Sequence, residues 1–207
     1  MRDIKIIPVP KGPRTWWNSS TARWLVTFTG FPLGGFAATL IVGPVDNPGS
    51  AVLGGLITGS VLGAVQAWGL GPHRPPAGQW IAATALGLMA GLGVAAAAVD
   101  YESSLTALLG QGAICGLAVG AAQALVLRRR IGRLAVAWPF ALAAAWATGW
   151  AVTHSIGVRV EEQFVVFGAS GALVVTALTA VLPFVLNRHA RRRGGLAPAV
   201  RLVETGA

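Results

Sequence analysis

The sequence predicts an all-α integral membrane protein, and three observations lead to this class. Hydrophobic residues make up 54% of the 207 residues and charged residues only 11%, whereas a soluble domain has about 25% charged residues. The mean hydropathy is high, at +0.64. Six stretches with uncharged cores are each long enough for a spanning helix, which needs about 20 apolar residues, and each is bounded by proline, glycine or charge.

The predicted spanning helices account for most of the chain. They cover residues 22–43, 50–70, 78–99, 104–127, 133–156 and 164–187. The connections between them are short, 4 to 7 residues with these bounds, which is typical of antiparallel neighbours in a bundle. We therefore expect three regions: an N-terminal arm (1–21), a six-helix transmembrane bundle (22–187) and a basic C-terminal tail (188–207).

The first twenty residues, MRDIKIIPVPKGPRTWWNSS, contain no hydrophobic core before Trp16 and no small-residue cleavage site after one. They are therefore not expected to be a signal peptide. Pro8, Pro10 and Pro13 favour extended backbone. The segment is interpreted as a cytoplasmic arm.

The loops differ sharply in charge when they are assigned alternately to the two sides of a membrane. One side collects all but one of the basic residues: Arg2, Lys5, Lys11, Arg14, Arg23, Arg74, Arg128, Arg129, Arg130, Arg133, Arg188, Arg191, Arg192, Arg193 and Arg201. The other side has Arg159 and most of the acids: Asp46, Asp100, Glu102, Glu161 and Glu162. Short basic loops stay cytoplasmic, so both termini are predicted to be cytoplasmic and to meet anionic lipid headgroups. A nucleic-acid partner is not expected, because no domain is left to hold one.

Four tryptophans fall at the predicted inner ends of the helices: Trp24, Trp68, Trp80 and Trp138. An amphipathic indole suits the headgroup region of a bilayer. The sequence therefore predicts that these residues anchor the bundle at the membrane interface.

A repeat of small and polar residues runs through the even-numbered helices. The second helix has Gly55, Gly59, Gly63 and Gln66, and 57 residues later the fourth helix has Gly112, Gly116, Gly120 and Gln123. The sixth helix has a weaker copy in Gly168, Ala172, Thr176 and Thr179. In the odd-numbered helices, Trp24, Trp80 and Trp138 are followed by Gly34, Gly91 and Gly149. We predict three helical-hairpin repeats of about 57 residues, related by an axis along the membrane normal.

The glutamines lie on the glycine face of their helices. At about 100° per residue, Gly55, Gly59, Gly63 and Gln66 form one narrow stripe, and Trp68 points away from it. In hydrocarbon, helices associate by close approach at small residues and by interhelical hydrogen bonds. We interpret Gln66 and Gln123 as groups that hold helices together; the alternative is that they line a solute path.

Residues typical of other membrane functions are sparse. Ionisable groups inside a bilayer mark transport or proton relay, and the six cores contain none. His154, near the outer end of the fifth helix, comes closest, and we interpret it as interfacial. No Cys or His spacing suits a metal or haem, so neither a metal nor another cofactor is expected. Cys115 is interpreted as a packing residue. Mitochondrial carriers also have six spans in three repeats, but Pro139 and Pro183 lack the acid of that family's motif.

The segment FGASGAL, Phe167–Leu173, is similar to the Gly-x-Ser-Gly segment of rhomboid intramembrane proteases, which would make Ser170 a nucleophile. That family uses a histidine on a later helix, whereas here the segment lies in the last predicted span. No catalytic residue is therefore assigned.

The segment GAAQALVLRRR, with Gly-x2-Gln followed by leucine and an arginine-rich loop, resembles a loose class of uncharacterised bacterial multi-pass membrane proteins. That resemblance implies no function. Together with a bias towards Ala, Gly and Arg, it predicts a multi-pass protein of a bacterial plasma membrane. From the small-residue faces we expect a non-catalytic interaction or scaffold protein, an accessory subunit of a larger membrane complex or a homo-oligomer; the alternative is a passive pore for a small neutral or apolar solute.

Overall fold

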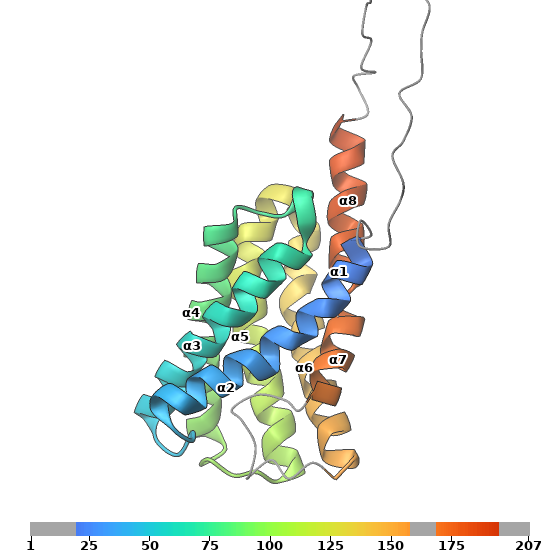
Figure 1. Cartoon of the computed structure of the whole chain (residues 1–207). Helices are drawn as coiled ribbons and strands as arrows, with labels where there is room; N and C mark the ends of the chain where they lie inside the picture. Colours follow the sequence, from blue (N-terminus) through green and yellow to red (C-terminus); the bar gives the residue numbers. More distant parts are fainter. Residues whose placement is uncertain (1–19, 158–168, 195–207) are drawn as a thin grey trace, which may run out of the picture.

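The computed structural model describes residues 20–157 and 169–194, and within these ranges every element is a helix (Figure 1). The elements are α1 (Ser20–Val26), η2 (Thr27–Thr29), α2 (Gly30–Val42), α3 (Pro48–Gly69), η3 (Gly71–His73), α4 (Ala77–Ala98), α5 (Leu105–Ile131), η4 (Gly132–Ala137), α6 (Trp138–Ser155), α7 (Ala169–Leu178) and α8 (Val181–Gly194). The predicted all-α class is thus confirmed for the described residues.

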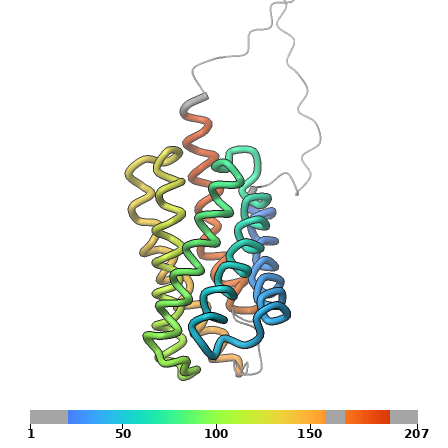
Figure 2. Tube along the Cα trace, turned by 90° about the vertical axis from the view of Figure 1, so that its left-hand side faces the viewer, coloured from blue at the N-terminus to red at the C-terminus, as the bar shows by residue number. Residues whose placement is uncertain are grey.

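Five helical stretches of the described chain are long and apolar enough to cross a membrane. They are Thr21–Val42, Pro48–Gly69, Ala77–Ala98, Leu105–Ser155 and Ala169–Arg192. The fourth has 51 residues and turns back on itself, because α5 ends at Gly132, whose φ of +60° is accessible mainly to glycine. After the short 3-10 helix η4, α6 returns along α5 (Figure 2).

Two of the five stretches are interrupted at positions that prolines explain. A helical proline lacks the N–H group and collides with the carbonyl four residues earlier. Pro32 thereby disturbs the helix at Phe28, inside the 3-10 segment η2. Pro183 does the same at Thr179, where α7 gives way to α8. At this second break the Ala180 amide donates to the Ala177 carbonyl at 3.2 Å, which releases the Thr176 carbonyl from the usual helical pairing.

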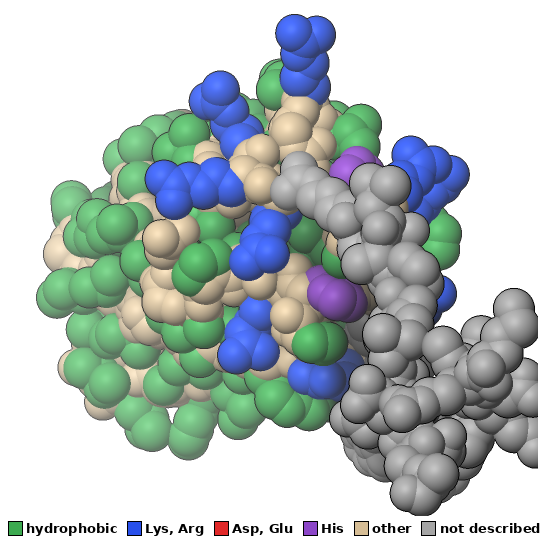
Figure 3. Space-filling model, turned by 90° about the horizontal axis from the view of Figure 1, so that it is seen from above, with side chains coloured by type: hydrophobic (Ala, Val, Ile, Leu, Met, Phe, Trp, Pro, Cys, Tyr) green, Lys and Arg blue, Asp and Glu red, His purple; other side chains and the backbone are tan. Residues whose placement is uncertain are grey.

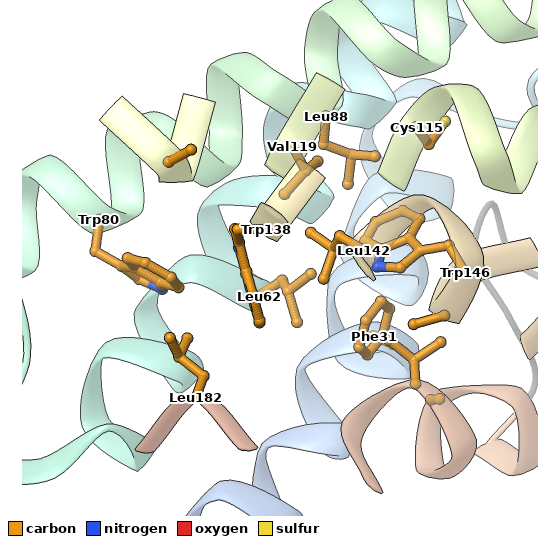
Figure 4. Close-up of a cluster of buried hydrophobic side chains, with 14 of the residues drawn as sticks. Phe31, Leu62, Trp80, Leu88, Cys115, Val119, Trp138, Leu142, Trp146 and Leu182 are labelled. Atoms are coloured by element: carbon orange, nitrogen blue, oxygen red, sulfur yellow. The ribbon is translucent and has the colours of Figure 1, made fainter. Parts of the chain in front are cut away.

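The helices form a closed ring around a filled centre. Successive helices contact one another from α2 to α7, and the first segment, α1 and η2, also contacts α7 and α8 (Figures 1 and 2). In the centre of the bundle, the aromatic side chains of Phe31 on α2 and Trp146 on α6 pack edge to face, with their centroids 5.5 Å apart. Leu62, Leu88 and Val119 are buried in the same cluster (Figure 4). Apolar side chains therefore occupy the middle of the bundle.

Charge is separated between the two ends of the bundle. The described acids lie in the turns at one end: Asp46, Asp100 and Glu102. The opposite end, viewed in Figure 3, is covered with arginines and shows no acidic side chain. Those with described side chains are Arg23, Arg74, Arg128, Arg129, Arg130, Arg133, Arg188, Arg191 and Arg192. We refer to this face as the basic end.

The outer surface of the bundle is apolar, because large apolar side chains are exposed on helices around the whole ring. Examples are Leu40 on α2 (70% exposed), Val94 on α4 (61%), Leu125 on α5 (67%) and Phe140 on α6 (68%). Soluble monomers rarely expose large contiguous apolar patches. Exposed apolar side chains together with five helical stretches long and apolar enough to cross a membrane are typical of a membrane protein.

Candidate functional site

The glycine stripe of α3 lies directly against α4. A Cβ atom added to Gly55 would come within 2.6 Å of the Leu88 carbonyl oxygen, and one added to Gly59 within 2.7 Å of the Ala85 Cα atom. At Gly63 the nearest atom would be the Ile81 Cα, at 2.9 Å. Since real Cβ atoms essentially never approach backbone within 3.0 Å, only glycine permits this contact.

The stripe of α5 makes the corresponding contact with α6. An added Cβ atom would lie 2.5 Å from the Leu142 carbonyl oxygen at Gly116 and 2.5 Å from the Pro139 Cα atom at Gly120. At Gly112 it would meet the Trp150 ring at 2.6 Å. Each stripe thus packs onto the helix that follows it in the chain, so these glycine faces are covered within the chain.

Gln123 lies at the centre of a polar layer that joins four helices. Its side chain is 1% exposed. Its Nε2 atom donates to Thr84 Oγ1 on α4 at 2.9 Å and to Gln66 Oε1 on α3 at 3.3 Å. Its Oε1 atom accepts a hydrogen bond from Trp138 Nε1 on α6 at 2.8 Å. Both ends of this amide are therefore engaged by side chains of other helices.

Gln66 occupies the equivalent place between α3 and α4, but less deeply. Its side chain is half-buried, and Oε1 accepts from Trp80 Nε1 at 3.3 Å as well as from Gln123. Thr84 completes the layer by donating to the Trp80 carbonyl at 2.9 Å. The two segments 57 residues apart thus make the same contact, a glutamine with the tryptophan that opens the next helix.

Where α1 meets the end of α7, a hydroxyl and a carbonyl group take the place of the amide. Trp24 Nε1 donates to Thr179 Oγ1 at 3.2 Å and to the Thr176 carbonyl at 3.1 Å. This is the carbonyl that the break before α8 releases. Trp24 therefore closes the ring of helices by donating to a backbone carbonyl that loses the Ala180 amide at the break between α7 and α8.

These contacts correct the prediction for three of the four tryptophans assigned to the membrane interface. Trp24, Trp80 and Trp138 are 1%, 0% and 7% exposed, so their rings face the protein interior and not the headgroups. The physical reason is the indole N–H, which finds an acceptor on a neighbouring helix in each case. Of these four residues, Trp68 alone is exposed, at 48%.

Two members of the site could not be singled out from the sequence. Thr84 has no counterpart in the small-residue stripes, and only its burial beside Gln123 reveals its role. Arg23 donates from Nη2 to the Trp68 carbonyl and lies with its Cζ atom 5.2 Å from the centroid of the Trp68 ring. A cation at the C-terminus of a helix, here α3, complements the helix dipole.

The remaining predicted residues are distributed as follows. Gly168 lies outside the described residues, whereas Ala172 and Thr176 are buried on α7. Cys115 is buried between helices, with its Cα atom 2.9 Å from a Cβ placed on Gly91. His154 is exposed at the end of α6.

The chemistry that this polar layer supports is adhesion between helices. Amide, hydroxyl and indole groups bond to one another, and no described group of three or more His, Cys, Asp or Glu residues is placed to hold a metal ion. Searches of protein-family models, curated proteins and solved structures find no match to this chain.

Proposed function

We propose that this protein is a non-catalytic interaction or scaffold protein of a bacterial plasma membrane. In this proposal the chain crosses the membrane six times, because α5 and α6 form separate spans, and both termini are cytoplasmic. The basic end then meets anionic headgroups. Its partners are a second membrane subunit or another copy of the chain.

One observation favours an interaction role over a solute path. The outer face of α6 carries small residues at every position of one stripe: Ala141, Ala144, Thr148, Ala151 and Ser155. All are exposed except the half-buried Ala151. The hydroxyls of Thr148 and Ser155 donate to carbonyls of their own helix, at 2.8 and 2.6 Å. The stripe therefore presents a low, apolar surface of the kind that lets a second helix approach closely.

The surface available to a partner is not the one expected from the sequence. The glycine stripes of α3 and α5 suggested association, but they are covered by α4 and α6. The amides proposed for a path bond to one another and to indoles, and apolar side chains fill the ring. The support for a partner now comes from α6, and the path has no comparable support.

The test is purification in mild detergent, followed by native mass spectrometry. We expect the chain to emerge with itself or a second subunit at fixed stoichiometry. Ala144→Leu should abolish that association while leaving the protomer folded, because the added side chain points outward. Ala82→Leu, at an exposed alanine of α4, is the matched control and should keep the complex. A monomer that conducts solute in liposomes would overturn the proposal.

The proposed topology has its own test, cysteine labelling in a Cys115→Ala background. Cysteines placed at Asp46 or Asp100 should react with an impermeant maleimide in intact cells, because both residues lie at the acidic end. Cysteines at Arg74 or Arg130 should react only after the membrane is opened. Labelling of the basic positions in intact cells would invert the topology.

A further inference from the structure

At one corner of the basic end, two guanidinium groups converge on the turn after α3. Arg23 is half-buried and donates to the Trp68 carbonyl, and a Cβ placed on Gly71 would lie 3.5 Å from its Nη1 atom. Arg74 is exposed, and its Nη1 atom donates to the Gly71 carbonyl at 3.3 Å. Both cations thus gather around a single turn of backbone.

The positive charge of this corner is incompletely compensated within the described chain. The described acids all lie at the opposite end of the bundle. Arg23 Nε is buried and has no hydrogen-bond partner among the described residues. The carbonyl end of α3 supplies only about half an elementary charge, whereas two arginines bring two.

The corner also borders apolar surface that suits a membrane boundary. The Trp68 ring is 48% exposed and lies against the Arg23 guanidinium. Helix α8 packs against η3 and adds Arg188, Arg191 and Arg192 to the same end. A ligand for this corner should therefore combine an anionic head with an apolar body.

We infer that Arg23 and Arg74, with the Trp68 ring, form a binding site for one anionic phospholipid. The phosphate oxygens accept hydrogen bonds from the two guanidinium groups, which match phosphate in geometry, and the glycerol and upper acyl chain lie against the indole. This inference rests on the proposed function, in which the basic end meets headgroups, and it names the lipid class and the residues.

The experiment is native mass spectrometry of the detergent-purified protein titrated with phosphatidylglycerol or phosphatidylcholine. The two lipids share the phosphate, but the choline cation is repelled by the arginines, so we expect preferential retention of phosphatidylglycerol. Arg74→Gln should weaken that retention by about tenfold, the loss typical of one hydrogen bond to a charged group. Inorganic phosphate at the same concentration should not displace the lipid, because it lacks the apolar body.

The control removes the same charge elsewhere on the basic end. Arg133→Gln lies on η4 and is exposed, so it should leave retention unchanged. Equal loss in Arg133→Gln and Arg74→Gln would show that net charge alone retains the lipid and would overturn the site, as would displacement by inorganic phosphate. Arg23→Gln also removes the α3 contact, so its thermal stability is measured beside Arg74→Gln. Association through α6 is measured separately, by the stoichiometry of the purified complex, and none of these outcomes changes it.

Discussion

Replacing Gly116 by leucine is expected to prevent the bundle from folding. A Cβ atom alone would lie 2.5 Å from the Leu142 carbonyl oxygen and 2.8 Å from the Ala143 Cα atom. Both are backbone atoms, so no side-chain rotation relieves the collision and α5 must move away from α6. That movement would also separate Gln123 from Trp138, whose hydrogen bond spans the same interface. We expect a cost above about 4 kcal/mol, the range of severe core disruption.

Gly110 provides the matched control on the same helix. A Cβ placed there has a single neighbour, Val99 Cγ1, at an ordinary 3.9 Å. Gly110→Leu should therefore elute from size exclusion as the native protein does and melt at a similar temperature, whereas Gly116→Leu should aggregate or fail to accumulate. Equal profiles and melting temperatures for the two variants would contradict the close-packing account. Gly59→Leu should behave like Gly116→Leu, since its Cβ would lie 2.7 Å from the Ala85 backbone.

The helix positions follow closely from the sequence, because apolar runs end at proline, glycine or charge. The stretch 78–99, for example, corresponds to α4, Ala77–Ala98. Three stretches depart from this agreement. The stretch predicted from residue 133 begins as α6 only at Trp138, and the stretch predicted to end at residue 187 is divided between α7 and α8, which runs to Gly194. Helix α5 was predicted to end at residue 127 but extends through three arginines to Ile131. An apolar run ends at the first charged residue, but the hydrogen bonds of a helix can continue past it, because arginine is a good helix former. On α3 and α5, the face that carries the glycine stripe is the face that closely approaches the following helix.

The partners of the buried tryptophans could not be predicted in the same way. An indole near a helix end suits both the headgroup region and a buried hydrogen bond. The choice depends on whether another helix places an acceptor within reach, as Thr179 does for Trp24 across 155 positions of sequence. The helical period of the sequence shows which face of a helix carries a stripe, but the neighbour that packs on that face is decided by the tertiary structure. For the same reason the three-repeat origin of the chain stays a prediction, although two of its units make matching contacts.

The second large effect is expected for Gln123→Leu. The change removes three hydrogen bonds at once and leaves Trp138 Nε1 buried without its acceptor. With interhelical hydrogen bonds contributing roughly 0.6 to 1.7 kcal/mol each, the unfolding free energy should fall by about 2 to 4 kcal/mol. Gln66→Leu should cost about half as much by the same scale, because only the oxygen of Gln66 takes part in the layer and the side chain is half-buried. The repeated glutamines are thus equivalent in sequence but unequal in the bundle.

A double-mutant cycle with Trp138→Phe separates this account from a simple loss of packing. Phenylalanine removes the indole donor, and with it the shortest of the three hydrogen bonds of Gln123. In the Trp138→Phe background, Gln123→Leu should therefore lower the unfolding free energy by less than it does in the native background. We expect a coupling energy of about 1 kcal/mol, typical of contacting residues in one hydrogen-bond network, measured from thermal or denaturant unfolding in detergent. Strict additivity of the two changes would mean that the amide and the indole do not support each other. If Gln123→Leu has normal stability but alters solute flux in liposomes, the glutamines line a solute path. A residue that only lines such a path can be replaced without weakening the contacts between the helices around it.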